Sequence, residues 1–430
     1  MKLSLRSGVV RLFSAAVVDQ VLLSAASFLM GLILVRYTSD TDYALFVILQ
    51  STLLLVTTVH SSAVCGPVAI LAPKTAPEPK REMIGIIWHS QNRLRWPTLL
   101  AGVATAAIGD LTGILQRQSA LVLGIGIIAG WWAVERNYVR NALIIYSRPR
   151  LLLTVDAVYV VVLLAGTLWA ASGIGMPAVW VTVAFAVAAY LSSVVGDRAV
   201  AKQIGWPRGK AGPLWRDLRS LSFWAVIGAF IYWLFSRSYV YILAARLDLK
   251  AVADVNVVRL MVMPAILLIL GLQSVLTPVA SAWIAEVGFD RMLRRLNVII
   301  VAVGACEIAY FGLIWMFRGW VMATVMHKHI GQLDLFLLLW LVWAFVSLFR
   351  EVLVTAVYAF GRLRWLAWQI GVSAAIALCI AWFGIPWWGA AAALIALVVG
   401  EVTNLAGIIY AIRKMQSEIR LNGVAAYSDI

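Results

Sequence analysis

Five arginines lie inside long apolar segments of this 430-residue chain, and their chemistry needs an explanation: Arg136, Arg140, Arg237, Arg259 and Arg350. A guanidinium group stays charged at physiological pH, and its planar fork of donors matches a carboxylate or a phosphate. A charge in the middle of an apolar segment costs roughly 2.5–3.5 kcal/mol on insertion scales. Each arginine is therefore expected to meet an acid, a water-filled cavity or an anionic ligand.

Arg237 and Arg259 are the best placed to share a ligand. The segment from Phe223 to Ala280 consists of two apolar runs on either side of a short charged turn, Arg246–Lys250. Each arginine lies about eight residues from that turn, which is roughly 12 Å along a helix. We expect the two to form a substrate-facing pair. The alternatives are an internal ion pair for each, or a side chain that extends to the membrane surface.

The other three arginines have two expected roles. Arg136 and Arg350 lie close to the middle of their segments and join the candidate substrate-binding set. Arg140 and Asp156 are equally far from the turn at Arg148, which predicts a structural ion pair. Removing one partner would leave the other buried and uncompensated, so removing both should cost less than removing either.

Six acidic residues occupy the same apolar segments: Asp19, Glu135, Asp156, Glu307, Glu351 and Glu401. Three of them, Asp19, Glu307 and Glu401, have no basic partner nearby in the sequence. They are candidate proton or sodium sites, with Asn404 one turn after Glu401 as an additional ligand. The alternative for each is a structural hydrogen bond. The three cysteines also lie in apolar segments, so neither a disulfide nor a metal cluster is expected, and no cofactor is.

The composition places all these residues in a membrane protein. Apolar residues make up 63% of the chain, the mean hydropathy is +0.92, and there are 20 tryptophans. A hydrocarbon core about 30 Å thick needs roughly 20 apolar residues per helix. Twelve segments qualify, at 12–35, 43–71, 96–115, 119–146, 151–172, 176–196, 221–244, 251–277, 297–317, 333–358, 365–384 and 386–411. The chain is therefore predicted to be an all-α polytopic membrane protein with twelve transmembrane helices, not a soluble domain.

The net charge of +15 reflects how the chain is oriented in the membrane. The termini and the even-numbered connections hold 24 Lys and Arg, whereas the odd-numbered connections hold six. Basic residues collect on the cytoplasmic side, so both termini are expected in the cytoplasm, and binding to nucleic acid is not expected. Two cytoplasmic stretches, 81–95 and 281–295, mix apolar with charged residues and predict helices that lie along the membrane interface.

An internal repeat divides the chain. At an offset of 214 residues, three arginines of the first half fall on arginines of the second: Arg136 on Arg350, Arg148 on Arg362 and Arg150 on Arg364. Six spans per half give both halves the same orientation. This predicts two six-helix bundles related by a pseudo-two-fold axis along the membrane normal. The expected parts are an N-terminal lobe at 1–196, a basic cytoplasmic linker at 197–219, a C-terminal lobe at 220–412 and a cytoplasmic tail at 413–430.

Two stretches resemble a known family. VDQVLLSAASFLMGLILVRYTSDTDYALF is similar to the first span of Wzx-type polysaccharide flippases, and YVYILAARLDLKAVADVNVVRLMVMP is similar to their span 7–8 region. Ala44 and Asp248 depart from the usual pattern, where Gly and a Leu-Gly pair are common. These flippases belong to the multidrug/oligosaccharidyl-lipid/polysaccharide (MOP) exporter superfamily.

The resemblance implies two lobes around a central cavity in the bacterial inner membrane. It implies a protein that works as a monomer and moves an undecaprenyl-pyrophosphate-linked oligosaccharide to the periplasmic leaflet, with Arg237 and Arg259 on the pyrophosphate. O-antigen and exopolysaccharide pathways use such proteins, and a proton or sodium gradient is the expected driving force. No covalent bond is made, so an enzyme is not expected.

Two other functions stay open. One is a drug or organic-cation antiporter of the same superfamily, because the acids inside the spans balance the arginines. The other is a membrane-embedded polysaccharide polymerase or ligase. Such enzymes need a large periplasmic loop, and the longest one expected here, Arg318–Gln332, has about 15 residues.

Overall fold

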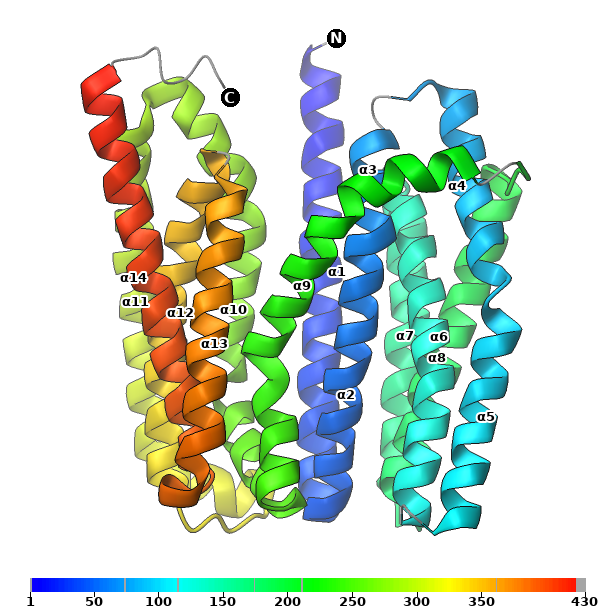
Figure 1. Cartoon of the computed structure of the whole chain (residues 1–430), viewed down its shortest axis with the longest axis vertical. Helices are drawn as coiled ribbons and strands as arrows, with labels where there is room; N and C mark the ends of the chain where they lie inside the picture. Colours follow the sequence, from blue (N-terminus) through cyan, green and yellow to red (C-terminus); the bar gives the residue numbers. More distant parts are fainter. Residues whose placement is uncertain are drawn as a thin grey trace. The chain divides into compact units, whose positions relative to one another are not determined.

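The computed structural model of this chain describes residues 2–72, 75–113, 116–173, 175–209, 212–360 and 362–422, and every element in these ranges is helical (Figure 1). The chain forms two compact units, Met1–Phe230 (unit 1) and Ile231–Ile430 (unit 2). Both are built from long helices, and spans that follow one another in the chain run in opposite directions (Figure 1).

Unit 1 consists mostly of long helices, with the short helices η1 and α3 among them. The long helix α9 begins in unit 1 and continues into unit 2. The helices are α1 (Lys2–Tyr37), α2 (Asp40–His60), the π-helix η1 (Ser61–Cys65), α3 (Gly66–Leu71), α4 (Pro77–Asn92), α5 (Arg95–Thr112), α6 (Arg117–Ile145), α7 (Pro149–Ala170), α8 (Pro177–Gln203) and the first part of α9 (Gly212–Arg246). Helix α6 packs against α2, α5 and α8, and α7 packs against α1 and α8. This arrangement brings α1, α6, α7 and α8 together around one polar centre.

Unit 2 starts within α9 and continues to the C-terminus. Its further elements are α10 (Leu249–Val287), α11 (Phe289–Trp320), the π-helix η3 (Val321–Met326), α12 (Leu333–Ala359), α13 (Leu363–Trp388) and α14 (Ala391–Asn422). Helix α12 packs against α10, α11 and α14, and α13 packs against α14. Helix α12 is the centre of the unit, and fourteen of its side chains are buried.

Local signals in the sequence set the ends of several helices. Ser39 caps α2 by accepting a hydrogen bond from the backbone N–H of Asp42 at 3.1 Å, and Asp248 caps α10 by accepting from Ala251 at 2.7 Å. A side-chain oxygen at this position satisfies a donor that the helix leaves free. Gly288 separates α10 from α11 with a φ of 78°, a left-handed conformation that glycine adopts at little cost.

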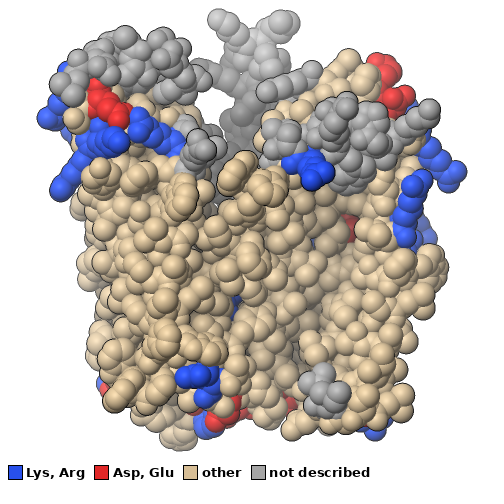
Figure 2. Space-filling model, in the orientation of Figure 1, with Lys and Arg blue, Asp and Glu red and all other residues tan. Residues whose placement is uncertain are grey.

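In the described part of the chain, eleven helical segments are long and apolar enough to cross a membrane. The third segment expected from the sequence, 96–115, corresponds to α5, which has 18 residues and carries Arg95 and Asp110 near its ends. Residues 114–115 lie outside the described ranges. Helix α5 lies beside α6 (Figure 1), so the order of elements agrees with the twelve expected spans. Between its charged ends, the face in Figure 2 shows almost only uncharged residues.

The stretch 197–219 is folded into unit 1 and is not a loop throughout. Its first residues complete α8, and α9 begins at Gly212. Between them, the Trp206 ring stacks on Trp88 of α4 at 4.6 Å, and the Trp206 carbonyl lies 2.9 Å from His89 Nε2. The unit boundary falls within α9 rather than at 196 or 220. One reason is that Ser222 of α9 donates a hydrogen bond to the Ala63 carbonyl at 2.6 Å.

Only one of the two expected interfacial helices forms a separate helix. Residues 81–95 fall largely in α4, a separate helix whose apolar face is buried against unit 1. Residues 281–295 do not form a helix of their own, because α10 continues to Val287 and α11 begins at Phe289. The halves of the sequence repeat therefore differ at this connection.

A π-helical turn interrupts span 2. Polar side chains from neighbouring helices bind this turn: Asn137 Nδ2 donates to Ser61 Oγ at 2.8 Å, and Asn141 Nδ2 donates to the Cys65 carbonyl at 3.2 Å. Gln91 Nε2 of α4 lies 2.7 Å from His60 Nε2. Such turns widen the backbone and often occur near functional sites.

Candidate functional site

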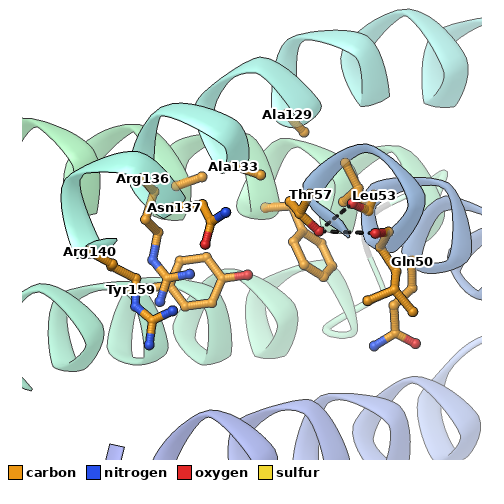
Figure 3. A pocket seen from close by; sticks show the side chains of 12 residues that line it. Gln50, Leu53, Thr57, Ala129, Ala133, Arg136, Asn137, Arg140 and Tyr159 are labelled. Atoms are coloured by element: carbon orange, nitrogen blue, oxygen red, sulfur yellow. Dashed lines mark hydrogen bonds between the residues drawn. The ribbon is translucent and has the colours of Figure 1, made fainter. Parts of the chain in front are cut away.

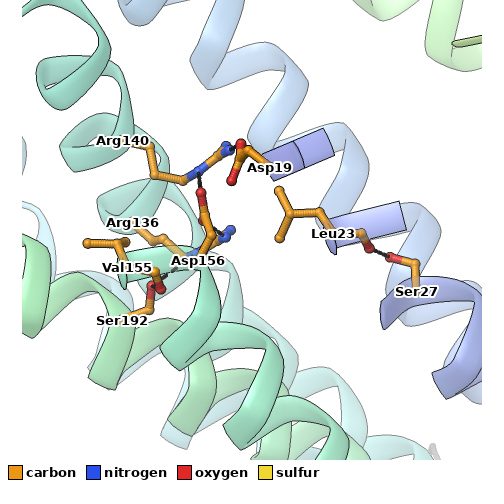
Figure 4. A network of polar contacts seen from close by, with 8 residues as sticks. All are labelled: Asp19, Leu23, Ser27, Arg136, Arg140, Val155, Asp156 and Ser192. Carbon is orange, nitrogen blue, oxygen red and sulfur yellow. Dashed lines mark hydrogen bonds and ion pairs between the residues drawn. The ribbon is translucent and has the colours of Figure 1, made fainter. Parts of the chain in front are cut away.

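A network of four charged residues lies at the centre of unit 1 (Figure 4). Arg140 connects two acids: its Nη2 is 2.6 Å from Asp19 Oδ2, and its Nε is 2.9 Å from the Asp156 carboxylate. Arg136 pairs with the same Asp156 through Nη2, and its Nε donates to Ser192 Oγ at 3.1 Å. Two arginines and two aspartates from α1, α6 and α7 thus balance one another.

The Arg140–Asp156 contact agrees with the expectation from sequence. Asp19, which has no basic partner nearby in the sequence, also pairs with Arg140. Its partner Arg140 is 121 residues away in the chain, and the packing of α1 against α7 brings them together. One Asp19 oxygen, Oδ1, is buried without a hydrogen-bond partner among the described atoms.

A cavity of about 270 Å³ opens beside this network (Figure 3). Arg136, Arg140 and Asn137 line it from α6, and Gln50 and Thr57 line it from α2. Tyr159 of α7 also lines it, and its ring centroid is 3.8 Å from the Arg136 guanidinium carbon. Arg136 is therefore held by an acid, a hydroxyl and an aromatic face while it lines the cavity.

Unit 2 has a network of charged residues in which, unlike in unit 1, acids outnumber arginines. Arg350 Nε is 2.5 Å from Glu401 Oε1, and Arg350 Nη2 is 2.5 Å from Glu351 Oε1. Ser347 Oγ donates to Glu401 at 2.5 Å, and Gln273 Nε2 donates to Glu351 at 2.5 Å. Two glutamates surround one arginine, so this group has one negative charge more than positive when both acids are ionised.

Glu401 has no basic partner nearby in the sequence, but it has one in the structure. Arg350 of α12 approaches it from 51 residues away because α12 and α14 pack together. Only Glu401 Oε1 is engaged, while Oε2 is buried without a hydrogen-bond partner among the described atoms. Asn404, its expected co-ligand, lines a cavity of about 320 Å³ together with Arg350, Glu351 and Gln273. Each of the repeated arginines, Arg136 and Arg350, thus lines a cavity in its own unit.

Two further acids within the spans have contrasting environments. Glu135 is paired, with Arg95 Nη2 at 2.9 Å and the Trp131 indole N–H at 3.1 Å. Glu307 of α11 is 1% exposed, and neither of its oxygens has a hydrogen-bond partner among the described residues. The third ion-site candidate is therefore a buried carboxyl group with no visible compensation.

Arg237 and Arg259 differ from the other arginines inside spans. Arg136, Arg140 and Arg350 each pair with a carboxylate, but no ion pair with a described acid occurs at Arg237 or Arg259. Both side chains are half-buried.

Aromatic and polar groups surround this second pair. Arg259 lies over the Trp340 ring at 5.6 Å, and Arg237 is within electrostatic range of Arg259. Close by, Tyr239 Oη donates to Asn256 Oδ1 at 2.8 Å and joins α9 to α10. Two uncompensated positive charges repel each other here, so an anion between them would be stabilised.

The arrangement of helices was compared with that of known proteins. No family model and no curated protein matches this sequence. Solved structures do match over nearly the whole chain. An inward-facing multidrug resistance MATE transporter of the MOP superfamily superposes with a TM-score of 0.77 at 12% identity, over 94% of this chain and 96% of that one.

Lipid II flippase MurJ, in an inward closed conformation, gives a TM-score of 0.72 at 12% identity, over 94% of this chain and 87% of that one. The chain has the fold of the MOP superfamily transporters. A MOP superfamily transporter from Pyrococcus furiosus, whose binding pocket is described as reversed in polarity, gives 0.65 at 11% identity, over 96% of each chain. With this MOP transporter fold and its eleven apolar helices, the chain is a multi-pass membrane protein.

Proposed function

We propose that this protein is a Wzx-type flippase. It moves an undecaprenyl-pyrophosphate-linked oligosaccharide repeat unit from the cytoplasmic to the periplasmic leaflet by alternating access, in O-antigen or exopolysaccharide synthesis. It acts as a monomer in the bacterial inner membrane, with both termini in the cytoplasm, and a proton or sodium gradient drives it. The MOP transporter fold, which MurJ shares, and the similarity of the first span and of the span 7–8 region to Wzx-type flippases support the proposal.

The observation that carries the proposal is the absence of described acid partners at Arg237 and Arg259. Among the described arginines within spans, these two keep an uncompensated charge, whereas three others are neutralised by carboxylates. A pyrophosphate would relieve their mutual repulsion and accept charge-assisted hydrogen bonds worth roughly 1.5–3 kcal/mol each.

Arg136 and Arg350 have a secondary place in the substrate path. Each lines a cavity with its charge already satisfied. Such a guanidinium group can still donate to sugar hydroxyl groups through N–H groups that its acid does not occupy. We therefore assign them to the oligosaccharide rather than to the pyrophosphate.

Glu401 and Asn404 are the proposed coupling site. The excess acid of the unit 2 network and the Oε2 of Glu401, which has no partner among the described atoms, favour a cation there. Glu307 is the second choice, because it is buried without a partner among the described residues. Asp19 is the third, since Arg140 already compensates its charge.

The drug or organic-cation antiporter is the second candidate function, and the similarity to MATE transporters favours it. The polymerase or ligase has less support, because the connection is shorter in the structure than the sequence predicts. In the expected periplasmic loop, 318–332, residues up to Met326 are helical, which leaves His327–Gln332 as connection.

Binding to the purified protein separates the candidates. A flippase should bind an undecaprenyl-pyrophosphate lipid, and Arg237→Gln with Arg259→Gln should abolish that binding. An antiporter should bind a lipophilic cation with no dependence on these arginines. Binding of the cation alone would overturn the proposal.

A further inference from the structure

A groove at one end of unit 2 lies outside all the polar centres described above. It has a volume of about 420 Å³ and is formed by α11, α12 and α14. Lys and Arg gather at this end, where α14 terminates (Figure 2). The groove has two parts of different chemistry, a basic rim and an apolar floor.

Three exposed arginines form the rim: Arg294 of α11, and Arg413 and Arg420 of α14. None of them pairs with an acid of the described chain. The acid in the rim, Asp290, accepts a hydrogen bond from Gln416 Nε2 at 2.9 Å, which ties α11 to α14. The rim therefore has a net positive charge of two when its side chains are ionised.

The floor consists of aliphatic side chains, which are Leu293, Leu353, Ile409 and Ile412. They continue into the buried core of unit 2, to which Leu293 and Ile412 belong. The spacing explains why rim and floor meet in one groove. Residues 409, 412, 413, 416 and 420 share one face of α14, and 290, 293, 294 and 297 share one face of α11.

The rim also lies at a defined level along the helices. In α11, the basic residues of the first two turns end at Arg295, and an uncharged run follows to Cys306. In α14, an uncharged run from Val402 ends where Arg413 begins. The groove thus straddles the point at which both helices leave the hydrocarbon core, and the phosphates of a bilayer lie at this level.

We propose that this groove binds an anionic phospholipid, with its phosphate on the arginine rim and the start of its acyl chains along the aliphatic floor. A free phosphate would use the rim alone. A zwitterionic lipid would bring a positive headgroup to a positive rim. The charge and the floor together select a lipid with a net negative headgroup. This site is independent of the proposed transport activity.

Native mass spectrometry of the full chain in detergent tests the site, with phosphatidylglycerol and phosphatidylcholine as probes. Each Lys or Arg near an anionic lipid surface contributes about fivefold in affinity. We expect Arg294→Gln with Arg413→Gln to weaken phosphatidylglycerol binding about 25-fold, and binding of phosphatidylcholine to remain weak and unchanged. The matched control is Arg291→Gln with Lys414→Gln, which removes the same charge from the same two helices outside the groove. It should change the affinity less than about threefold, because these residues do not line the groove.

Four results would overturn the proposal. An equal loss in both double variants would show a diffuse charge effect, and equal binding of the two phospholipids would show no selection for charge. Glycerol 3-phosphate binding as tightly as phosphatidylglycerol would show an anion site without a lipid floor. A dimer that Arg294→Gln with Arg413→Gln dissolves would make the groove an interface between copies. Thermal unfolding of each variant in detergent checks that folding is unchanged.

Discussion

Replacing Asp156 by Asn perturbs the unit 1 network at its central acid. Asp156 is 0% exposed and pairs with both Arg136 and Arg140. The amide keeps the shape of the side chain but removes its charge, so two arginines are left with one aspartate. Removing one partner of a buried ion pair costs about 3–5 kcal/mol. The whole stability of a domain is on the order of 5–15 kcal/mol, so we expect a large loss of folded protein.

The contacts determine which second substitution compensates. Adding Arg136→Gln leaves the Asp19–Arg140 pair complete and no charge of the network unpaired. Most of the lost stability should return. Adding Arg140→Gln also restores neutrality, but it separates Asp19 from its only described ion partner and leaves Arg136 without one. Little stability should return, although the sequence alone predicts recovery for this combination.

The assay is the yield of monodisperse protein after detergent extraction, followed by the midpoint of thermal unfolding. The two double variants have the same net charge, share the Asp156→Asn substitution and differ only in which arginine is replaced. Any difference between them therefore reports the pairing of Asp19 with Arg140. Equal midpoints for both would refute the proposed division of the network into two pairs.

Three more predictions concern transport and topology. Arg237→Gln and Arg259→Gln should each lower transport of a lipid-linked oligosaccharide into proteoliposomes at least about tenfold, the equivalent of one charge-assisted bond. Lys at either position should restore only part of the transport, because it lacks the planar fork of donors. Normal transport by the double Gln variant would exclude binding of the pyrophosphate by these two arginines. Glu401→Gln should abolish the dependence on a proton or sodium gradient while substrate binding persists, and an unchanged dependence would exclude this coupling site. Single cysteines at Ser172 and Arg208, in a chain without other cysteines, should react from opposite sides, with position 208 accessible from the cytoplasm; the reverse would disprove the orientation.

The helical spans could be predicted because hydropathy depends on local sequence alone. Membrane helices satisfy their backbone internally and need long apolar runs, so the segments 12–35 to 386–411 could be located without knowing their neighbours. The stretch 281–295, for which the prediction of a separate helix was wrong, is amphipathic, and so is 81–95. Such a pattern suits a membrane surface and a protein surface equally, and packing decides between them. Trp88 packs on Trp206 because a later part of the chain returns to α4.

The partners inside the spans could be predicted only where a turn joins them. Arg140 and Asp156 belong to consecutive helices at equal distances from one turn, and this contact was expected. Asp19 and Glu401 have partners on helices that are distant in the chain. Their contacts depend on how each helix is rotated about its axis and on which helices are neighbours. Neither the rotation of a helix nor the identity of its neighbours can be read from a single sequence.

The π-helical turn at Ser61–Cys65 has a consequence for the two ends of span 2. One extra residue in the turn advances every later side chain by about 100° around the helix axis. Before the turn, Gln50 and Thr57 face the cavity of unit 1. After it, Val68 and Ala72 belong to a buried cluster together with residues of α4. The same span therefore points its cavity-lining face and the face that packs against α4 in different directions. Deleting one residue between 61 and 65 would rotate the later residues back by about 100° and expose the face that packs against α4.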